Sequence, residues 1–279
     1  MGVFCYYPAM AEIRLICSDV DGTLINSKGR ISDIDRKALT YAACELGIPF
    51  AIVSGRFRGG LGCITSQLDF KAAISCFNGL YIEMDGKVVH DEVTSSSILL
   101  GVLPLIRSFG CTPLIFTLDS WVMEDRNIWY ENQIRACGFE GRLMNLEEAL
   151  SPDSGMKFYK ILAKNTDHRI LENLKSEFLK GGYPDLQAVF SSPCILEFLP
   201  KGTTKADTVD LLASYMHIGT ENVMAFGDYD NDIGMLEHAG VGVCMANGTE
   251  ATKAVADFVT LSNEESGIGH ALEQLVFRA

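Results

Sequence analysis

Short apolar stretches separated by helix-like segments make up the first part of the chain. The apolar stretch 13–17 stops at Ser18-Asp19-Val20-Asp21-Gly22-Thr23, which is typical of a buried parallel strand that ends in a glycine-containing loop. Ser32 is a predicted N-cap for a helix over 33–46, which Gly47 would end. Further strands are expected over 48–53 and 72–77. This alternation predicts an α/β fold with a doubly wound, mostly parallel, Rossmann-like sheet.

The pattern changes in the middle of the chain. Segments 80–83 and 87–90 flank Met84-Asp85-Gly86, a signal for a β-hairpin. Strands expected over 112–118, 121–124 and 158–163 then mix with helices. We therefore expect residues 85–199 to form an inserted α+β domain.

The first pattern returns after Lys201. It predicts a helix over 204–216, strands over 223–226, 241–245 and 258–260, and a final helix from about Ser262. Residues 1–84 and 200–279 would then form one core domain that the insert interrupts.

Composition narrows the functional classes. The chain has 279 residues and a net charge of −13, so a nucleic-acid partner is disfavoured. No apolar run is long enough to cross a membrane, and the N-terminal residues lack a basic leader, so a cytoplasmic location is expected. The nine cysteines and five histidines are dispersed, which favours reduced thiols and argues against zinc. The sequence predicts no particular oligomeric state.

Carboxylates follow two of the predicted strands. Asp19 and Asp21 end the first strand, and Asp228 and Asp232 follow the strand over 223–226. Because Asp-Gly is a common turn former, either cluster alone could be only a loop. Together, beyond one edge of a sheet, they would repel one another strongly without a cation. Oxygen ligands without thiol or imidazole neighbours favour Mg²⁺.

The ordered set of motifs resembles the haloacid dehalogenase-like superfamily, and within it the Cof-type phosphatases. The motifs are DVDGT at 19–23, Ser54 in VSGR, Lys205 in KGTTK and GDYDND at 227–232. Asn78-Gly79 and the stretch 263–275 also match, and the insert is similar to that group's α/β cap.

This resemblance implies a role for each motif residue. Asp19 would be the nucleophile that becomes an aspartyl-phosphate, Asp21 the general acid and base, and Lys205 a cation that stabilises the transferring phosphoryl group. The side chains of Asp19 and Asp228 and the backbone carbonyl of Asp21 would hold Mg²⁺. The remaining site residues would be Ser54, Gly55, Asn78 and Asn231 around the phosphate or substrate, with Asp232 supporting the metal and Lys205.

The expected function is therefore hydrolysis of a small phosphorylated metabolite, such as a sugar phosphate, by a phosphoric monoester hydrolase. Two alternatives stay open: a phosphomutase of the same superfamily, and a catalytically idle module that binds phosphate esters. Tyr229 and Ala206 depart from the family pattern at positions that would affect substrate choice. Glycines 55–62 do not fit a dinucleotide-binding motif, and no P-loop motif occurs.

Overall fold

The computed structural model describes residues 12–202 and 204–278, whose strands form two separate sheets. The larger sheet has the strand order β14-β13-β12-β1-β2-β3-β4-β5, parallel from β14 to β3 and antiparallel from β3 to β5. Its strands are β1 (Leu15–Ser18), β2 (Phe50–Val53), β3 (Ala73–Cys76), β4 (Tyr81–Met84), β5 (Lys87–Asp91), β12 (Val223–Gly227), β13 (Val241–Cys244) and β14 (Phe258–Val259). The predicted α/β class with a mostly parallel sheet is confirmed.

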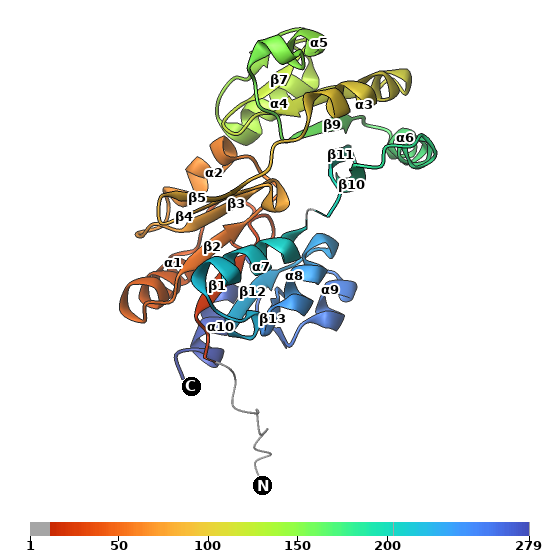
Figure 1. Ribbon diagram of the computed structural model, residues 1–279. Helices are drawn as coiled ribbons and strands as arrows, with labels where there is room; N and C mark the ends of the chain where they lie inside the picture. The colour runs from red at the N-terminus through yellow and green to blue at the C-terminus, as the bar shows by residue number, and fades with distance from the viewer. Residues whose placement is uncertain (1–11, 203, 279) are drawn as a thin grey trace.

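Helices cover both faces of the larger sheet (Figure 1). They are α1 (Asp33–Thr40), α2 (Arg58–Thr65), α7 (Lys205–Met216), α8 (Ile233–His238), α9 (Glu250–Val255) and α10 (Gly267–Leu275). The two faces follow from the alternation along β1. Ile16 packs in one cluster with Leu39 of α1 and Leu272 of α10, whereas Leu15 packs in another with Leu212 of α7.

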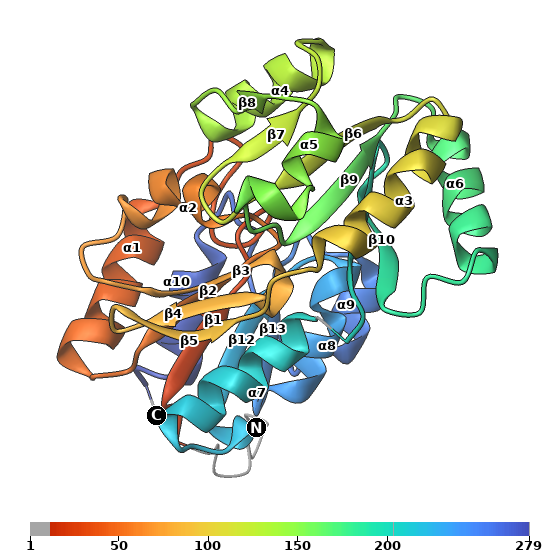
Figure 2. The same ribbon diagram turned by 45° about the horizontal axis from the view of Figure 1, so that its top comes forward.

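The smaller sheet has the order β10-β11-β9-β6-β7-β8 and is antiparallel except between β7 and β8. Its strands are β6 (Thr112–Phe116), β7 (Trp121–Met123), β8 (Arg142–Leu143), β9 (Lys160–Lys164), β10 (Leu186–Ser192) and β11 (Ile195–Pro200). Its helices are α3 (Ser96–Ser108), α4 (Ile128–Cys137), α5 (Leu146–Ala149) and α6 (His168–Lys180). In Figure 2 this unit lies over the larger sheet, which it joins through the connections from β5 to α3 and from β11 to α7.

Each face of the smaller sheet has a different partner. Ile161 and Ala163 of β9 pack in a cluster with residues of α3 and α6, such as Leu103 and Leu171. The alternate residue Leu162 faces the other way and belongs to the same cluster as core residues of the larger sheet. The two units therefore meet across an interface that is partly apolar.

Three element boundaries differ from the sequence-based expectation. Strand β5 pairs with β4 through a turn in which Asp85 and Gly86 both have positive φ, so the hairpin belongs to the larger sheet, and a boundary at residue 85 would divide it. The helix over 33–46 is α-helical only to Thr40 and continues as a π-helical turn over Tyr41–Glu45. The last helix begins at Gly267 rather than near Ser262, because residues 263–266 form a turn that ends with Ser266 at a φ of 63°.

Short helical turns complete the described chain, at Phe77–Gly79, Pro152–Ser154, Thr220–Asn222 and Asp230–Asp232. No helix within the described residues is both long and apolar enough to span a lipid bilayer. The N-terminal residues in which the sequence lacks a basic leader lie largely outside the described part, which starts at residue 12.

Candidate active site

A cavity of about 560 Å³ lies between the two sheets, at the carboxyl ends of β1, β2 and β12. From the larger sheet's side it is lined by Tyr229 and by seven of the site residues expected from the sequence: Asp19, Asp21, Ser54, Gly55, Lys205, Asp228 and Asn231. From the other side it is lined by residues of β6, α4, β9 and the β10–β11 hairpin. The parallel strands thus bring distant segments to one edge of the sheet.

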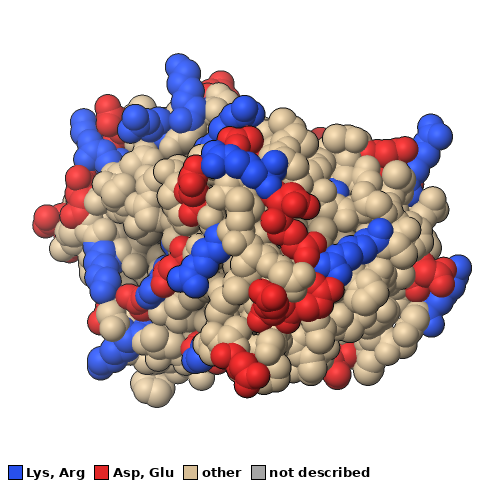
Figure 3. Space-filling view, turned by 90° about the horizontal axis from the view of Figure 1, so that it is seen from above, with Lys and Arg blue, Asp and Glu red and all other residues tan. Residues whose placement is uncertain are grey.

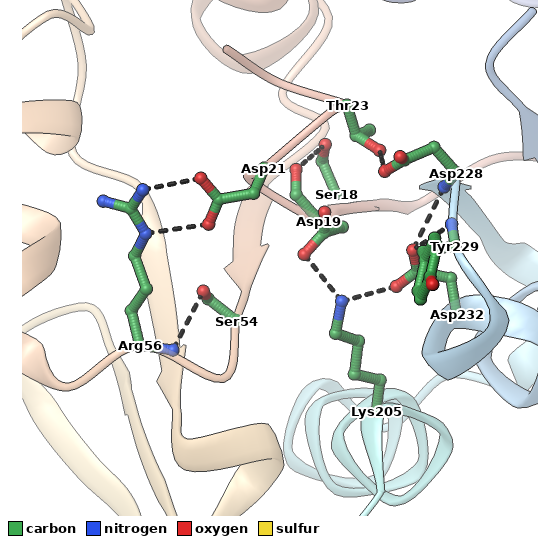
Figure 4. A network of polar contacts seen from close by, with 10 residues as sticks. All are labelled: Ser18, Asp19, Asp21, Thr23, Ser54, Arg56, Lys205, Asp228, Tyr229 and Asp232. Carbon is green, nitrogen blue, oxygen red and sulfur yellow. Dashed lines mark hydrogen bonds and ion pairs between the residues drawn. The ribbon is translucent and has the colours of Figure 1, made fainter. Parts of the chain in front are cut away.

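Lys205 is the central cation of the site. It is the first residue of α7, which the Thr204 side chain caps, and it is 2 % exposed. Its Nζ donates to Asp19 Oδ1 at 2.6 Å and to Asp232 Oδ1 at 2.5 Å (Figure 4). Burial alone would lower the pKa of Lys205, but the two carboxylates outweigh it and hold the pKa above its usual range.

Asp232 is fully buried and its second oxygen is also occupied. Oδ2 accepts hydrogen bonds from the backbone N–H groups of Asp228 and Tyr229, at 3.0 and 3.1 Å. With Oδ1 bound to Lys205, Asp232 fixes the loop after β12 and orients the lysine. The motif resemblance also implies that Asp232 supports a metal ion, and that role stays a prediction.

Asp228 faces Asp19 from the neighbouring strand. Its Oδ1 accepts from Thr23 Oγ1 at 2.8 Å (Figure 4). A Cβ added to Gly22 would lie 2.3 Å from Asp228 Oδ2, and the φ of Gly22 is +86°. Glycine is therefore required at position 22 for two reasons: the backbone conformation and the space that the carboxylate takes.

The buried carboxylates are costly to ionise in this environment. Burial raises the pKa of Asp19 to about 7, against the opposing effect of Lys205. Burial also raises the pKa of Asp228 to about 6, with Asp232 adding repulsion. A cation close to both oxygens would offset this cost.

A metal ion fits this arrangement. Carboxylate oxygens of Asp19, Asp228 and Asp232 lie within 4.8 Å of one another, and this set contains neither thiol nor imidazole. Oxygen-only ligands suit a hard divalent cation. The ligand set expected from the sequence has the backbone carbonyl of Asp21 in place of the Asp232 carboxylate. Both oxygens of Asp232 already accept hydrogen bonds, from Lys205 and from two backbone N–H groups, so they are less available to a metal ion.

Asp21 points away from this cluster. Both of its oxygens accept hydrogen bonds from Arg56, from Nε at 2.8 Å and from Nη2 at 2.6 Å (Figure 4). Its side chain is 60 % exposed, in contrast to the buried Asp19. Asp21 thus lines the cavity near its opening, where Arg56 holds the Asp21 side chain.

The loop after β2 supplies the phosphate-binding candidates. Ser54 is 2 % exposed, and its Oγ accepts from the Arg56 backbone N–H at 3.1 Å. Asn78 donates its backbone N–H to the Ser54 carbonyl at 2.9 Å, and a Cβ on Gly55 would lie 3.2 Å from Asn78 Oδ1. Asn78 is not among the residues that line this cavity, and its contact with the substrate stays a prediction.

Four charged residues of the cavity were missed by sequence reasoning: Arg56, Lys160, Lys164 and Glu197. Arg56 belongs to the VSGR motif, but the sequence analysis assigned no role to it. The strand containing Lys160 and Lys164 did carry a signal, because polar residues at every fourth position in an otherwise apolar strand share one face. Lys160 Nζ donates to the Gly55 carbonyl at 2.8 Å and to Glu197 Oε2 at 2.6 Å, which links the smaller sheet to the phosphate loop.

A family model described as haloacid dehalogenase-like hydrolase matches residues 16–272. The chain belongs to this family. The match covers both sheets and every motif residue discussed above, and it confirms the resemblance on which the expected site rests.

The chain is 28 % identical to phosphatase YwpJ of Bacillus subtilis, over 95 % of this chain and 100 % of the relative. It is 29 % identical to the 5-amino-6-(5-phospho-D-ribitylamino)uracil phosphatase YwtE of Bacillus subtilis, over 95 % and 98 %. A crystal structure of a haloacid dehalogenase-like hydrolase from Bacteroides thetaiotaomicron has a TM-score of 0.85 at 27 % identity and covers 95 % of this chain and 100 % of that one. The expected enzyme class, a phosphatase of the Cof type within this family, is confirmed.

One relative is much longer. Endoribonuclease YBEY, chloroplastic, of Arabidopsis thaliana is 26 % identical over 99 % of this chain, which spans 48 % of that protein. The chain therefore spans about half the length of this relative.

Proposed function

We propose that this hydrolase removes a phosphoryl group from a small phosphorylated metabolite, through a covalent aspartyl-phosphate on Asp19 and with Mg²⁺ as its cofactor. The observation that carries the proposal is the convergence around one cavity of Asp19, Lys205 and Asp228, which come from three distant segments. A cytoplasmic location stays part of the proposal, supported by the free thiols of the described cysteines.

Asp19, Asp228 and the Asp21 backbone carbonyl would hold the ion. When bound, Mg²⁺ supplies positive charge that offsets the repulsion between the phosphate ester and the carboxylates. Asp232 keeps the Asp228 loop and Lys205 in place through the contacts described above.

In the first half-reaction, a carboxylate oxygen of Asp19 attacks phosphorus, and the bond between phosphorus and the ester oxygen breaks. The Asp21 carboxyl gives its proton to the departing oxygen, so the leaving group departs as an alcohol. Lys205 stabilises the negative charge on the transferring group, which Ser54 Oγ and the Gly55 N–H also contact.

In the second half-reaction, Asp21 takes a proton from water, and the water oxygen attacks the phosphorus of the aspartyl-phosphate. The bond to Asp19 breaks, and inorganic phosphate and the free Asp19 carboxylate are restored. To serve in both steps, Asp21 must exchange its contact with Arg56 for one with the leaving group or the water.

The size and lining of the cavity support a sugar phosphate or a related polyol phosphate as the substrate. A volume of about 560 Å³ is within the range of pockets for small molecules. Ser191 and Ser192 line it at the β10–β11 hairpin, where they can meet hydroxyl groups. The relative YwtE, by its name, acts on a phosphorylated ribityl compound.

Hydrolysis of 4-nitrophenyl phosphate tests this function. We expect phosphate release with Mg²⁺, its loss on chelation with EDTA and its return when Mg²⁺ is added back. Asp228→Asn should raise the Mg²⁺ concentration for half-maximal rate by at least ~10-fold. Asp230→Asn is the matched control, since the exposed Asp230 in the same loop bonds only to Thr249 Oγ1 among the described side chains.

Turnover that survives chelation would contradict a role for the metal. An absence of turnover on aryl phosphates and sugar phosphates alike would favour the idle binding module. Conversion of a hexose monophosphate into an isomeric ester, without free phosphate, would favour the phosphomutase.

A further inference from the structure

Strand β9 lines the cavity opposite Asp19. Because side chains alternate along a strand, Lys160, Leu162 and Lys164 share the face toward the cavity, which all three line. Lys160 and Lys164 are four residues apart, so their Cα atoms are separated by roughly 13 Å. The strand therefore carries one lysine above the phosphate loop and a second lysine farther from it.

The charge of the first lysine is balanced within the protein. Lys160 Nζ lies 2.6 Å from Glu197 Oε2 and also donates to the Gly55 carbonyl. Both side chains are buried, so this pair needs no further partner.

The second lysine has no ion pair of its own among the described residues. Lys164 is 4 % exposed, and its Nζ donates to Gln133 Oε1 at 2.9 Å and lies 5.8 Å from the centre of the Trp129 ring. Within residues 12–202 and 204–278, no carboxylate forms an ion pair with Lys164; Glu197 is near enough to raise its pKa but is paired with Lys160. A buried ammonium without an ion pair of its own is costly, and burial lowers the pKa of Lys164 to about 8 although Glu197 opposes this effect.

The surroundings of Lys164 favour an anion from outside the chain. Lys164 and Gln133 both line the cavity that contains Asp19, and so do the apolar side chains of Phe116, Leu162 and Ile195. In such apolar surroundings an ammonium attracts an anion more strongly than it would in water. Figure 3 shows one face of the molecule, on which positive and negative side chains are interspersed. Lys164 differs from the exposed lysines in being buried.

We propose that Lys164, oriented by Gln133, binds a second anionic group on the leaving-group portion of the substrate. The preferred substrates are then phosphate monoesters whose far end carries a carboxylate or another phosphate. This inference rests on the proposed function, because it assigns the substrate class of the same cavity.

Three esters with the same phosphate and the same open six-carbon chain test it. In 6-phospho-D-gluconate the far end is a carboxylate, in D-glucitol 1,6-bisphosphate a phosphate, and in D-glucitol 6-phosphate an uncharged hydroxymethyl group. We expect the wild-type enzyme to hydrolyse at least one anionic ester with a kcat/KM roughly 10- to 100-fold above that of D-glucitol 6-phosphate. The preferred anionic ester identifies which of the two groups Lys164 binds.

Lys164→Met should remove this preference, mainly through KM, and should lower kcat/KM for the preferred anionic ester far more than for D-glucitol 6-phosphate. Lys157→Met is the matched control: Lys157 lies just before β9, its side chain is 70 % exposed, and its substitution removes the same charge. All three esters should be unaffected in that variant. Lys164→Arg should keep part of the preference, because it retains the positive charge.

Equal kcat/KM values for the neutral and both anionic esters in the wild-type enzyme would overturn the inference, and this comparison needs no variant to fold. A uniform loss on all three esters in Lys164→Met would also overturn it, since a purely structural role gives that result. If 4-nitrophenyl phosphate is hydrolysed with Mg²⁺ but no preference exists, this inference alone fails. If 4-nitrophenyl phosphate is not hydrolysed either, the proposed function fails with it.

Discussion

Asp21 differs from the other carboxylates of the site in its exposure and its partner. Asp19, Asp228 and Asp232 are buried, whereas the Asp21 side chain is 60 % exposed and bound to Arg56. A group that exchanges protons with a leaving alcohol and with water has to reach both. The position of Asp21 near the cavity mouth suits such a group, while the burial of Asp19 suits a nucleophile shielded from solvent.

Replacing Asp21 with Asn tests this assignment. The amide can neither give nor take the proton, so kcat should fall by ~10²–10⁴-fold while the fold is kept. Quenched-flow measurement of alcohol release and of phosphate release from a sugar phosphate, whose departing alkoxide needs the proton, separates the two half-reactions, and both should slow. An Asp21→Asn enzyme with wild-type kcat would refute the acid and base role.

At the scale of the element, the start of α7 decides where Lys205 lies. Thr204 Oγ1 accepts from the Asp207 N–H, and Asp207 Oδ2 accepts from the Thr204 N–H at 2.7 Å, which together form a capping box. Lys205 is the next residue, so the cap fixes the first turn of the helix from which its side chain extends to Asp19.

Thr204→Ala should therefore cost about 1 kcal/mol of the free energy of unfolding and also lower kcat several-fold, because the first turn of α7 frays. Asp167→Ala is the control: Asp167 caps α6 by accepting from the Arg169 N–H at 3.0 Å. It should cost a similar free energy in urea unfolding but leave kcat unchanged. Equal kcat values in the two variants would show that the cap does not position Lys205.

Local signals explain how much of the fold the sequence could predict. Strand β1, helix α7 and the β4–β5 turn follow from apolar runs, caps and Asp-Gly, and the structure has all three close to their expected bounds. The predicted start of α10 near Ser262 was wrong, because Ser266 adopts a left-handed conformation that residue type does not predict. The assignment of β5 to the larger sheet depends on pairing, which no local signal specifies.

Some residues of the candidate site could be predicted from local sequence signals, and others could not. Motif residues such as Asp19 and Asp228 could be found because each follows a predicted strand. Arg56, Lys164 and Glu197 could not be assigned, since their roles depend on contacts between segments far apart in the chain. The role of Asn78 stays a prediction, because a motif gives the position of a residue but not its orientation.

At the scale of the molecule, the two sheets approach each other closely beside the cavity. Helix α2 touches the β6–β7 turn: Arg58 binds both oxygens of Asp119 at 2.6 Å, and a Cβ on Gly59 would lie 2.5 Å from the Asp119 carbonyl oxygen. The rings of Phe57 and Phe116 also meet across this interface, with centroids 5.0 Å apart. Gly59 therefore permits the close contact between α2 and the β6–β7 turn.

Gly59→Ala should hold the two units apart and lower kcat/KM for 4-nitrophenyl phosphate by roughly tenfold, because substrate and catalytic groups are then misplaced. Gly62→Ala in the same helix is the control, since nothing lies within 4 Å of the added Cβ. It should leave kcat/KM unchanged and stabilise the protein by up to about 1 kcal/mol. Full activity in Gly59→Ala would contradict the need for this close approach.

Covalent catalysis by Asp19 is the central claim, and trapping the intermediate tests it most directly. The enzyme is mixed with substrate and Mg²⁺, quenched in acid, treated with borohydride and analysed by peptide mass spectrometry. Borohydride reduces an aspartyl-phosphate to homoserine, so we predict homoserine at position 19 and none in enzyme quenched without substrate. An unmodified Asp19 in enzyme quenched during steady turnover, or homoserine at position 21 in its place, would contradict the account.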